Sequence, residues 1–141
     1  MSEKKRRITA EDLYQLEQVT HAEIAPDGEH VIYAVQWVDE ETEKKYANLW
    51  LVDAEGGEPY RFTVGEQRDT TPRWSPDGQQ IAFLSNRDDE QQPQLYLIPV
   101  DGGEARQLTD LQGEFSSFEW SPQGDRLVIQ FRADQPAAEE R

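Results

Sequence analysis

The stretch Trp74-Ser75-Pro76-Asp77-Gly78 decides the fold, because the chain carries two further versions of it. These are Ile24-Ala25-Pro26-Asp27-Gly28 and Trp120-Ser121-Pro122-Gln123-Gly124. Each version places a large apolar residue two positions before the proline and a glycine two positions after it. Proline fixes φ at the second position of a turn, Asp accepts local hydrogen bonds at the third, and glycine tolerates a positive φ. Each stretch therefore predicts the tight turn of a β-hairpin.

A second motif repeats in step with these turns. The segment 48–53 (Asn-Leu-Trp-Leu-Val-Asp), followed by Gly56-Gly57-Glu58, recurs as the segment 94–99 (Gln-Leu-Tyr-Leu-Ile-Pro), followed by Gly102-Gly103-Glu104. The two copies are 46 residues apart. A period of this length built from four short strands is typical of a β-propeller blade. Pairs of helices would instead show a 3.6-residue spacing, which the repeats lack.

The spacing of the prolines supports the same period and locates one insertion. Pro76 and Pro122 are 46 residues apart, whereas Pro26 and Pro76 are 50 residues apart. We expect the four extra residues to form a loop within the charged stretch 37–46, between two strands.

We therefore predict an all-β fold, namely a partial β-propeller with two complete four-stranded blades, half of a third blade and a short N-terminal helix. Thr9 and Asp12, flanked by Ile8 and Leu13, indicate the start of that helix. The predicted segments are 1–18 for the N-terminal tail and helix, 19–66 for blade 1, 67–112 for blade 2, 113–132 for the first half of blade 3, and 133–141 for a truncated insertion between strands. Propellers close with roughly four to eight blades, so we expect a piece of a longer protein or a chain that associates.

The repeat assigns structural roles to two sets of residues. The turns comprise Pro26, Asp27, Gly28, Pro76, Asp77, Gly78, Pro122, Gln123 and Gly124. The predicted core between blades comprises Ile24, Val31, Tyr33, Trp74, Ile81, Phe83, Trp120, Leu127 and Ile129. In each blade the core residues occur two before, five after and seven after the turn proline, and the latter two positions alternate onto one face of a strand. Repeated tryptophans could form a ligand platform, but large residues here most often fill the space between blades.

Composition and charge exclude several classes of function. The formal net charge is −15, which argues against a nucleic-acid-binding surface because clustered cations are needed to contact phosphates. The basic run 4–7 is interpreted as a solvated tail. A mean hydropathy of −0.90 argues against a membrane span. With no cysteine and no apolar leader segment in its first residues, we expect a cytoplasmic protein.

Three strings together carry a resemblance to a known family. They are Pro72-Arg73-Trp74-Ser75-Pro76-Asp77-Gly78, Ile81-Ala82-Phe83-Leu84-Ser85-Asn86-Arg87 and Gly102-Gly103-Glu104-Ala105-Arg106-Gln107-Leu108-Thr109. The chain from about Ile8 to Arg132 resembles the amino-terminal propeller of the prolyl oligopeptidase family of serine peptidases, most of all the acylaminoacyl-peptidase branch. The turn motif alone is shared with TolB-like propellers. Gln123 departs from the family's usual Asp but leaves the Pro and Gly that shape the turn.

The resemblance implies a two-domain enzyme in which the propeller acts as substrate gate and scaffold for a C-terminal α/β-hydrolase domain that hydrolyses peptides. This chain carries no Gly-x-Ser-x-Gly elbow for a nucleophile. His21 and His30 are interpreted as strand-surface residues rather than catalytic bases. We therefore assign no catalytic residue, cofactor or metal, and we predict that this chain alone is inactive.

Two acidic clusters are candidate ligand sites. Asp39-Glu40-Glu41 with Glu43, and Asp88-Asp89-Glu90, occur in corresponding loops of blades 1 and 2. Carboxylates bind calcium, and in dipeptidyl-peptidase relatives a pair of glutamates holds the substrate's amine. Neither cluster has the spacing of a calcium loop, so solvated loops are favoured.

Three functional hypotheses follow. The first is a non-catalytic propeller fragment of a serine peptidase. The second is a TolB-like propeller that binds proteins without peptidase activity, against which the lack of an export signal counts. The third is self-association through exposed blade edges, by which copies of the chain complete a ring.

Overall fold

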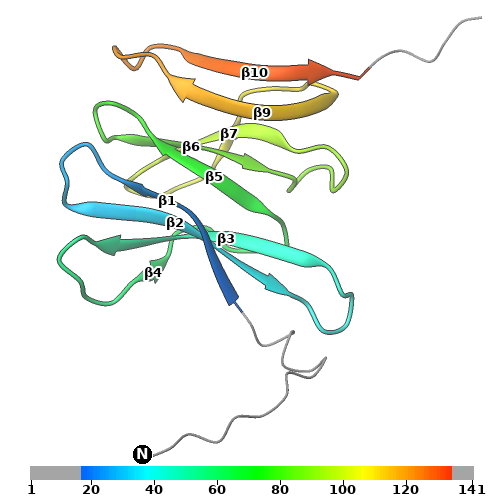
Figure 1. Cartoon of the computed structure of the whole chain (residues 1–141), viewed down its shortest axis with the longest axis horizontal. Helices are drawn as coiled ribbons and strands as arrows, with labels where there is room; N and C mark the ends of the chain where they lie inside the picture. Colours follow the sequence, from blue (N-terminus) through cyan, green and yellow to red (C-terminus); the bar gives the residue numbers. More distant parts are fainter. Residues whose placement is uncertain (1–16, 135–141) are drawn as a thin grey trace, which may run out of the picture.

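The computed structural model describes residues 17–134, which form three antiparallel sheets (Figure 1). The first sheet, blade 1, comprises β1 (Glu17–Ile24), β2 (His30–Val38), β3 (Lys45–Asp53) and β4 (Tyr60–Arg61). The second sheet, blade 2, comprises β5 (Asp69–Trp74), β6 (Gln80–Ser85), β7 (Gln94–Pro99) and β8 (Arg106–Gln107). The third sheet, half-blade 3, comprises β9 (Gly113–Trp120) and β10 (Leu127–Ala133). In each sheet the strands pair in the order of the chain. The predicted all-β partial propeller is confirmed.

The Pro-x-Gly segments form the predicted turns between the first two strands of each sheet. The three glycines have φ values of 73°, 72° and 76°, which residues with a Cβ adopt at a cost. In the second turn the Asp77 carboxylate accepts hydrogen bonds from the Gln79 amide and the Ser75 hydroxyl. In the third turn Ser121 Oγ instead donates to Asp125 Oδ1 at 2.9 Å. The turn therefore keeps its shape although Gln123 replaces the usual aspartate.

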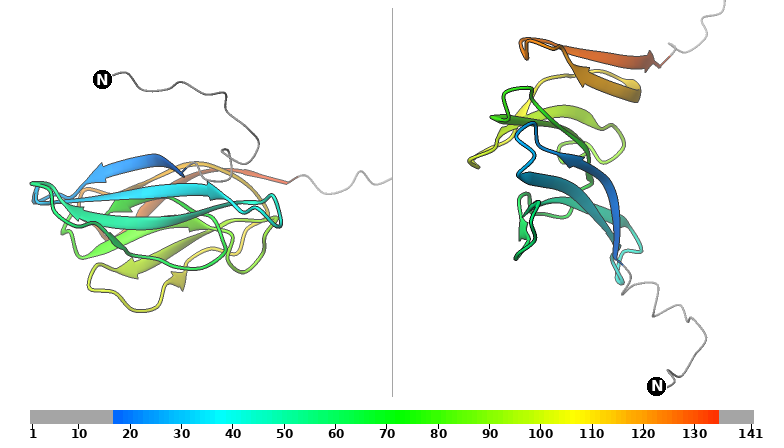
Figure 2. Two further views of the ribbon diagram at one scale, coloured as in Figure 1. Left: turned by 90° about the horizontal axis from the view of Figure 1, so that it is seen from below. Right: turned by 60° about the vertical axis from the view of Figure 1, so that its left-hand side comes forward.

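The sheets stack face to face, and the right-hand view of Figure 2 shows the three layers. Side chains of a strand alternate between the two faces of its sheet. Ile32 and Ala34 of β2 and Ile81 and Phe83 of β6 are fully buried in one core cluster between blades 1 and 2. The opposite face of blade 2 packs in the same manner on half-blade 3. That second core contains Ala82, Leu95, Leu97 and Phe118, with Trp120, Leu127 and Ile129 partly buried against it.

Three of the nine predicted core residues lie elsewhere. Ile24 is 61% exposed, and Val31 and Tyr33 are half-buried. Their strand neighbours Ile32 and Ala34 occupy the core in their place. The physical reason is that the positions five and seven residues after the turn proline face the preceding blade. The described residues include no sheet on that side of blade 1. For these three residues the structure corrects the prediction.

The insertion in blade 1 lengthens strands instead of forming a loop. β2 and β3 have nine residues each, whereas β6 and β7 have six. The pairs Trp37–Tyr46 and Val38–Lys45 continue the ladder toward the end of the hairpin. The rings of Trp37 and Tyr46 lie 5.7 Å apart, and such cross-strand aromatic pairs stabilise a hairpin. The stretch 39–44 between these strands is a loop, as predicted, but the extra residues lengthen the strands because they include partners for each other.

Some predictions fall outside the described residues. The N-terminal helix and the basic run 4–7 lie within residues 1–16, and most of the segment 133–141 lies beyond residue 134. The described part of the chain contains no helix, and hence none long and apolar enough to cross a membrane. The segment boundaries inferred from the repeat stay predictions.

Candidate functional site

Two tryptophans tie each blade to the one before it. Trp74 Nε1 donates a hydrogen bond to the Glu23 carbonyl oxygen at 3.0 Å, and Trp120 Nε1 donates to the Arg73 carbonyl oxygen at 3.2 Å. Glu23, Arg73 and Glu119 occupy the same position in successive repeats, directly before the large apolar residue. The Arg73 guanidinium also pairs with the Glu23 carboxylate at 3.2 Å. The first strands of the three sheets, β1, β5 and β9, are thus joined by polar contacts as well as by the apolar cores.

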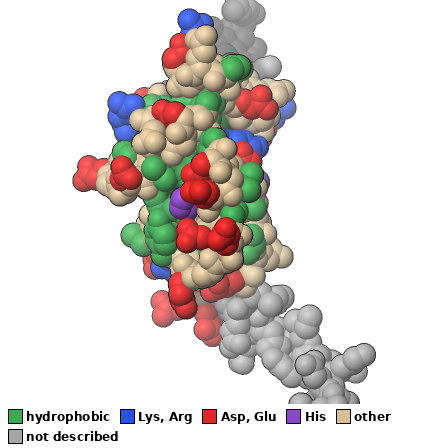
Figure 3. Space-filling model, turned by 90° about the vertical axis from the view of Figure 1, so that its left-hand side faces the viewer, with side chains coloured by type: hydrophobic (Ala, Val, Ile, Leu, Met, Phe, Trp, Pro, Cys, Tyr) green, Lys and Arg blue, Asp and Glu red, His purple; other side chains and the backbone are tan. Residues whose placement is uncertain are grey.

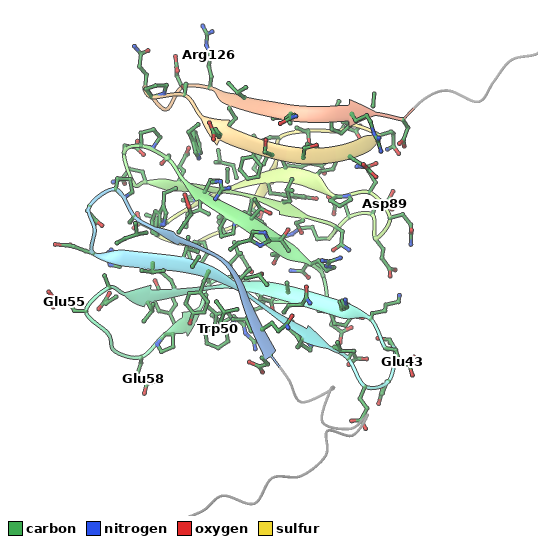
Figure 4. All side chains as sticks on the ribbon, viewed as in Figure 1. Glu43, Trp50, Glu55, Glu58, Asp89 and Arg126 are labelled. Carbon is green, nitrogen blue, oxygen red and sulfur yellow. The ribbon has the colours of Figure 1, made fainter. Side chains whose placement is uncertain are left out.

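The two ends of the stacked sheets differ in their loops. The turn end carries the Pro-x-Gly and Gly-Gly turns, and the loop end carries the segments 39–44 and 86–93. Figure 4 shows Glu43 and Asp89 together at the loop end, opposite Glu55 and Glu58 at the turn end. The loop end holds a cleft of about 620 Å³ between blades 1 and 2.

An ion pair spans this cleft. Lys44 Nζ lies 2.9 Å from Glu90 Oε1, and the two residues occupy equivalent positions 46 residues apart in successive repeats. The hydrogen bond and the charge of Glu90 raise the pKa of Lys44. Both side chains are about half exposed, so water screens the pair and its contribution to stability is small.

A buried ion pair supports the blade 2 side of the cleft. The Asp69 carboxylate is fully buried and accepts a hydrogen bond from Arg87 Nη2 at 3.0 Å. The Arg87 guanidinium also lies over the rings of Phe83 and Tyr96, 5.2 and 5.1 Å from their centroids. A buried carboxylate is stable only when it is paired and hydrogen-bonded. Gln67 Nε2 completes its shell with a bond to Asp69 Oδ2.

Tyr96 extends this network toward solvent. Its hydroxyl donates a hydrogen bond to Asp88 Oδ2. Burial, followed by the hydrogen bond and the charge of Asp88, raises the pKa of the Tyr96 phenol. Tyr96 therefore stays protonated at neutral pH and donates this hydrogen bond.

The lining of the cleft is polar and carries charges of both signs. It contains four cationic side chains (Lys44, Lys45, Arg68 and Arg87) and four acidic ones (Glu43, Glu66, Asp88 and Glu90). No serine, cysteine or histidine lines it, and a hydrolytic site needs a nucleophile with a base in reach. The cleft therefore offers a mixed-charge surface between two blades.

The turn end carries a smaller polar cluster around His30. His30 Nε2 lies 3.4 Å from Asp53 Oδ1, and its Nδ1 lies 3.6 Å from Asp27 Oδ2. Figure 3 faces the turn end and shows acidic side chains beside a histidine. Asp27, Glu29 and His30 could together hold a cation, but both acidic residues are exposed and Asp27 Oδ1 already accepts the Glu29 amide. The cluster is therefore a network of polar side chains on the surface.

The residues singled out from the sequence are distributed over both ends. The Asp39 carboxylate caps its own loop by accepting the amide and hydroxyl of Thr42, and these bonds lower the pKa of Asp39. His21 is an exposed residue of β1. It is distant in sequence from Asp53, which contacts His30. Lys44, Asp69 and Arg87 were not singled out from the sequence, although a charged residue at the border of an apolar strand is a usable signal.

Comparison with curated proteins finds peptidases. The chain is 39% identical over 84 residues to the uncharacterized peptidase YuxL of Bacillus subtilis, a match that spans 60% of this chain and 13% of that protein. It is 34% identical over 85 residues to dipeptidyl-peptidase 5 of Porphyromonas gingivalis, spanning 60% of this chain and 12% of that protein. The matched region thus represents about an eighth of the length of these relatives.

Solved structures with the same fold include both peptidases and TolB proteins. A putative TolB from Agrobacterium tumefaciens matches with a TM-score of 0.66 and 26% identity, over 87% of this chain and 41% of that one. An acylaminoacyl peptidase from Pyrococcus horikoshii matches with a TM-score of 0.67 and 19% identity, over 82% of this chain and 17% of that one. The second likeness, at this identity, shows the fold alone.

The resemblance found in the repeat motifs is confirmed by these relatives. The model of the tricorn protease N-terminal β-propeller domain matches residues 44–141, a stretch that includes β3 and β4 of blade 1, all of blade 2 and half-blade 3. The chain belongs to the family of tricorn protease N-terminal β-propeller domains.

Proposed function

We propose that this chain is part of the propeller of a serine peptidase, where it acts as scaffold and substrate gate for a C-terminal α/β-hydrolase domain. The observation that carries this proposal is the combination of stacked, tied blades with 39% identity to a peptidase. The substrates are peptides, as the names of the relatives indicate for those proteins. Hydrolysis belongs to the other domain, and the chain itself supplies shape and polar contacts.

The loop end is the end proposed to face the hydrolase domain. β1 begins there, because Glu17 at its start pairs with Trp37 near the loop 39–44. A segment that precedes blade 1 therefore enters the sheet at the same end as the mixed-charge cleft. Lys44 and Glu90 border that cleft from two different blades, so a shift between the blades would change its width. This arrangement supports a role in controlling access.

The experiment is to read the gene downstream of Arg141 and to assay the longer protein beside the 141-residue chain. We expect further blades, then a Gly-x-Ser-x-Gly elbow with Asp and His after it. The longer protein should hydrolyse short acyl-peptide or dipeptidyl substrates and spare folded proteins, whereas the 141-residue chain should hydrolyse neither. Blades that end without a hydrolase would contradict the peptidase assignment. Equal cleavage of folded proteins and peptides would contradict the gate.

A TolB-like propeller that binds proteins without peptidase activity is the second candidate. It is favoured by the 26% identity to a putative TolB over 87% of this chain. Under this alternative the downstream sequence continues with blades alone, and the longer protein reacts with no serine-directed inhibitor. The two candidates are therefore separated by the same experiment. A cytoplasmic location stays a prediction from composition.

A further inference from the structure

The first hairpin of blade 1 brings an imidazole and two carboxylates together at the turn end. Asp27 and Glu29 lie between β1 and β2, and His30 is the first residue of β2. Among the described residues, this is the one group of three such side chains whose metal-binding atoms, one from each, all lie within 4.8 Å of one another. Figure 3 shows a histidine beside acidic side chains at this end. Because all three residues belong to one hairpin, the arrangement is complete within a single blade.

The repeat shows which of these residues the turn itself requires. The same three positions carry Asp77, Gln79 and Gln80 in blade 2, and Gln123, Asp125 and Arg126 in half-blade 3. The aspartate of the turn is shared by blades 1 and 2 and accepts the same backbone amide in both. Glu29 and His30 are specific to blade 1. The turn forms without an imidazole and a second carboxylate in blade 2, so these two groups are not explained by the shape of the turn.

The two oxygens of the Asp27 carboxylate have different surroundings. Oδ1 accepts the Glu29 amide within the turn, whereas Oδ2 lies 3.6 Å from His30 Nδ1. Two ligand atoms at about 2.0–2.1 Å from a tetrahedral zinc ion are themselves about 3.4 Å apart. The separation of Asp27 Oδ2 and His30 Nδ1 is therefore close to that of two ligands of one ion, and the turn bond to Oδ1 does not have to break.

The second ring nitrogen of His30 faces another carboxylate. Nε2 lies 3.4 Å from Oδ1 of Asp53, which pairs with His30 across the β2–β3 ladder. Histidines that bind metals usually direct their other ring N–H at a carboxylate or carbonyl oxygen, which fixes the tautomer and makes the ligand more basic. With the proton held on Nε2, the lone pair of Nδ1 is directed toward Asp27. Blade 2 lacks this arrangement, because Pro99 stands at the position of Asp53.

A hollow gives an ion access to these groups. Its volume is about 380 Å³, and its lining comprises Gly28, Glu29, His30, Asp53, Glu55 and Gly56. A Cβ placed on Gly28 or Gly56 would meet no atom within 4 Å, so the rim of the hollow is open. The His30 side chain is 40% exposed. A hydrated ion can therefore enter and keep part of its water, which makes such a site weaker than a closed site with four protein ligands.

We propose that Asp27, Glu29 and His30 bind one zinc ion, with Asp53 orienting the imidazole. The Glu29 side chain is exposed and rotates toward the other two ligands, and water completes the coordination. An imidazole with carboxylates suits zinc, whereas calcium and magnesium prefer oxygen ligands alone. The bound ion would link the first turn of blade 1 to the end of β3 through His30. This inference does not rest on the proposed function.

The test is titration of the full 141-residue chain with zinc chloride, followed by calorimetry and by nuclear magnetic resonance of the histidine rings. We expect one ion per chain, with a dissociation constant in the micromolar range. The chain contains two histidines, and His21 is an exposed residue of β1 that serves as an internal control. Zinc should shift the ring resonances of His30 in proportion to saturation and leave those of His21 unchanged.

Substitutions separate the ligands from the surrounding charge. His30→Gln and Glu29→Gln should each weaken zinc binding roughly tenfold or more, because each removes one of three protein ligands. Asp53→Asn should also weaken it, by about tenfold, since it removes the partner that orients the imidazole. His21→Gln is the matched control and should bind zinc like the wild type. Circular dichroism should show that all four variants are folded, and calcium in excess should not displace the zinc.

Three results would overturn this inference. Zinc that binds only at millimolar concentration, or that shifts both histidines equally, would show adventitious binding to exposed side chains. Unchanged affinity in His30→Gln and Glu29→Gln would place the ion elsewhere. Displacement of zinc by an equal concentration of calcium would remove the role of the imidazole. A downstream gene without a hydrolase would refute the proposed function and leave the zinc titration unchanged.

Discussion

Blade 1 and blade 2 are copies of one sequence pattern, but they differ in how many of their faces are covered. Blade 2 packs on blade 1 through Ile81 and Phe83 and on half-blade 3 through Ala82 and Leu97. Among the described residues blade 1 has one neighbouring sheet, blade 2, and packs on it through residues that include Ile32 and Ala34. The comparison teaches that the sequence repeat determines where strands and turns form. Whether a given position of the repeat is buried in a core depends on whether another sheet packs against its face.

The largest expected effect comes from truncating one position in both blades. Phe83→Ala removes a fully buried ring between two sheets and should lower the free energy of unfolding by roughly 3–5 kcal/mol. Tyr33→Ala, the equivalent change in blade 1, should cost less, about 2 kcal/mol, because that side chain is only partly buried. Urea denaturation of both variants measures the difference. Equal losses would break the comparison.

The ion pairs provide a second contrast between a covered and an open surface. Asp69→Asn leaves Arg87 without its buried carboxylate, and we expect a loss of roughly 3 kcal/mol in the free energy of unfolding. Glu114→Gln breaks a pair whose side chains are more than 70% exposed and should change stability by less than about 1 kcal/mol. If both variants unfold at the same urea concentration, the distinction between the two surfaces does not hold.

The tryptophan ties should give a smaller effect. Trp74→Phe removes the indole N–H that reaches the Glu23 carbonyl, and we expect a loss of about 1–2 kcal/mol, mainly from the lost hydrogen bond. Trp50→Phe is the control, because Trp50 lies on the side of blade 1 away from blade 2 (Figure 4), where the Arg61 guanidinium lies over its ring. Thermal unfolding should separate the two variants. A control at least as damaging as Trp74→Phe would argue against the tie.

The smallest effect concerns the turns at acid pH. The hydrogen bond from the Ser75 hydroxyl, followed by that from the Gln79 amide, lowers the pKa of Asp77. Because the folded pKa is below its unfolded value near 3.8, this contribution is present above that pH and is lost as pH falls through the folded pKa. The Gln79 amide resonance should therefore shift below pH 3.8, whereas the Gly124 amide beside Gln123 should not follow Asp77. Shifts with one midpoint in both turns would contradict this assignment.

Much of the fold could be predicted from the sequence because the turn chemistry is local. Pro76, Asp77 and Gly78 specify a hairpin wherever they occur, and the 46-residue period places each strand relative to it. The buried face of β2 could not be predicted in this way. Both faces of β6 are apolar, from Ile81 and Ala82 onward. The alternation of apolar and polar residues therefore could not show which face of β2, the equivalent strand of blade 1, packs against another sheet.

The candidate site was predicted less well than the fold, and the reason is again physical. Asp69 and Arg87 are 18 residues apart, and their pairing depends on the β5–β6 register, which includes a bulge between Thr70 and Arg73. The Lys44–Glu90 contact crosses from one sheet to the next. Local pattern identifies such residues as charged, but only the stacking of sheets shows that they meet. The lengthened hairpin could not be predicted from the charged stretch alone, although the side chains of Trp37 and Tyr46, which pair across it, favour strands.

The most direct test of the stacked arrangement is the environment of the two indole protons, measured by nuclear Overhauser effects in an isotope-labelled chain. The account predicts contacts from Trp74 Hε1 to Glu23 in β1 and from Trp120 Hε1 to Arg73 in β5, each crossing from one sheet to the sheet before it. Indole contacts confined to the residues of their own sheet would contradict it.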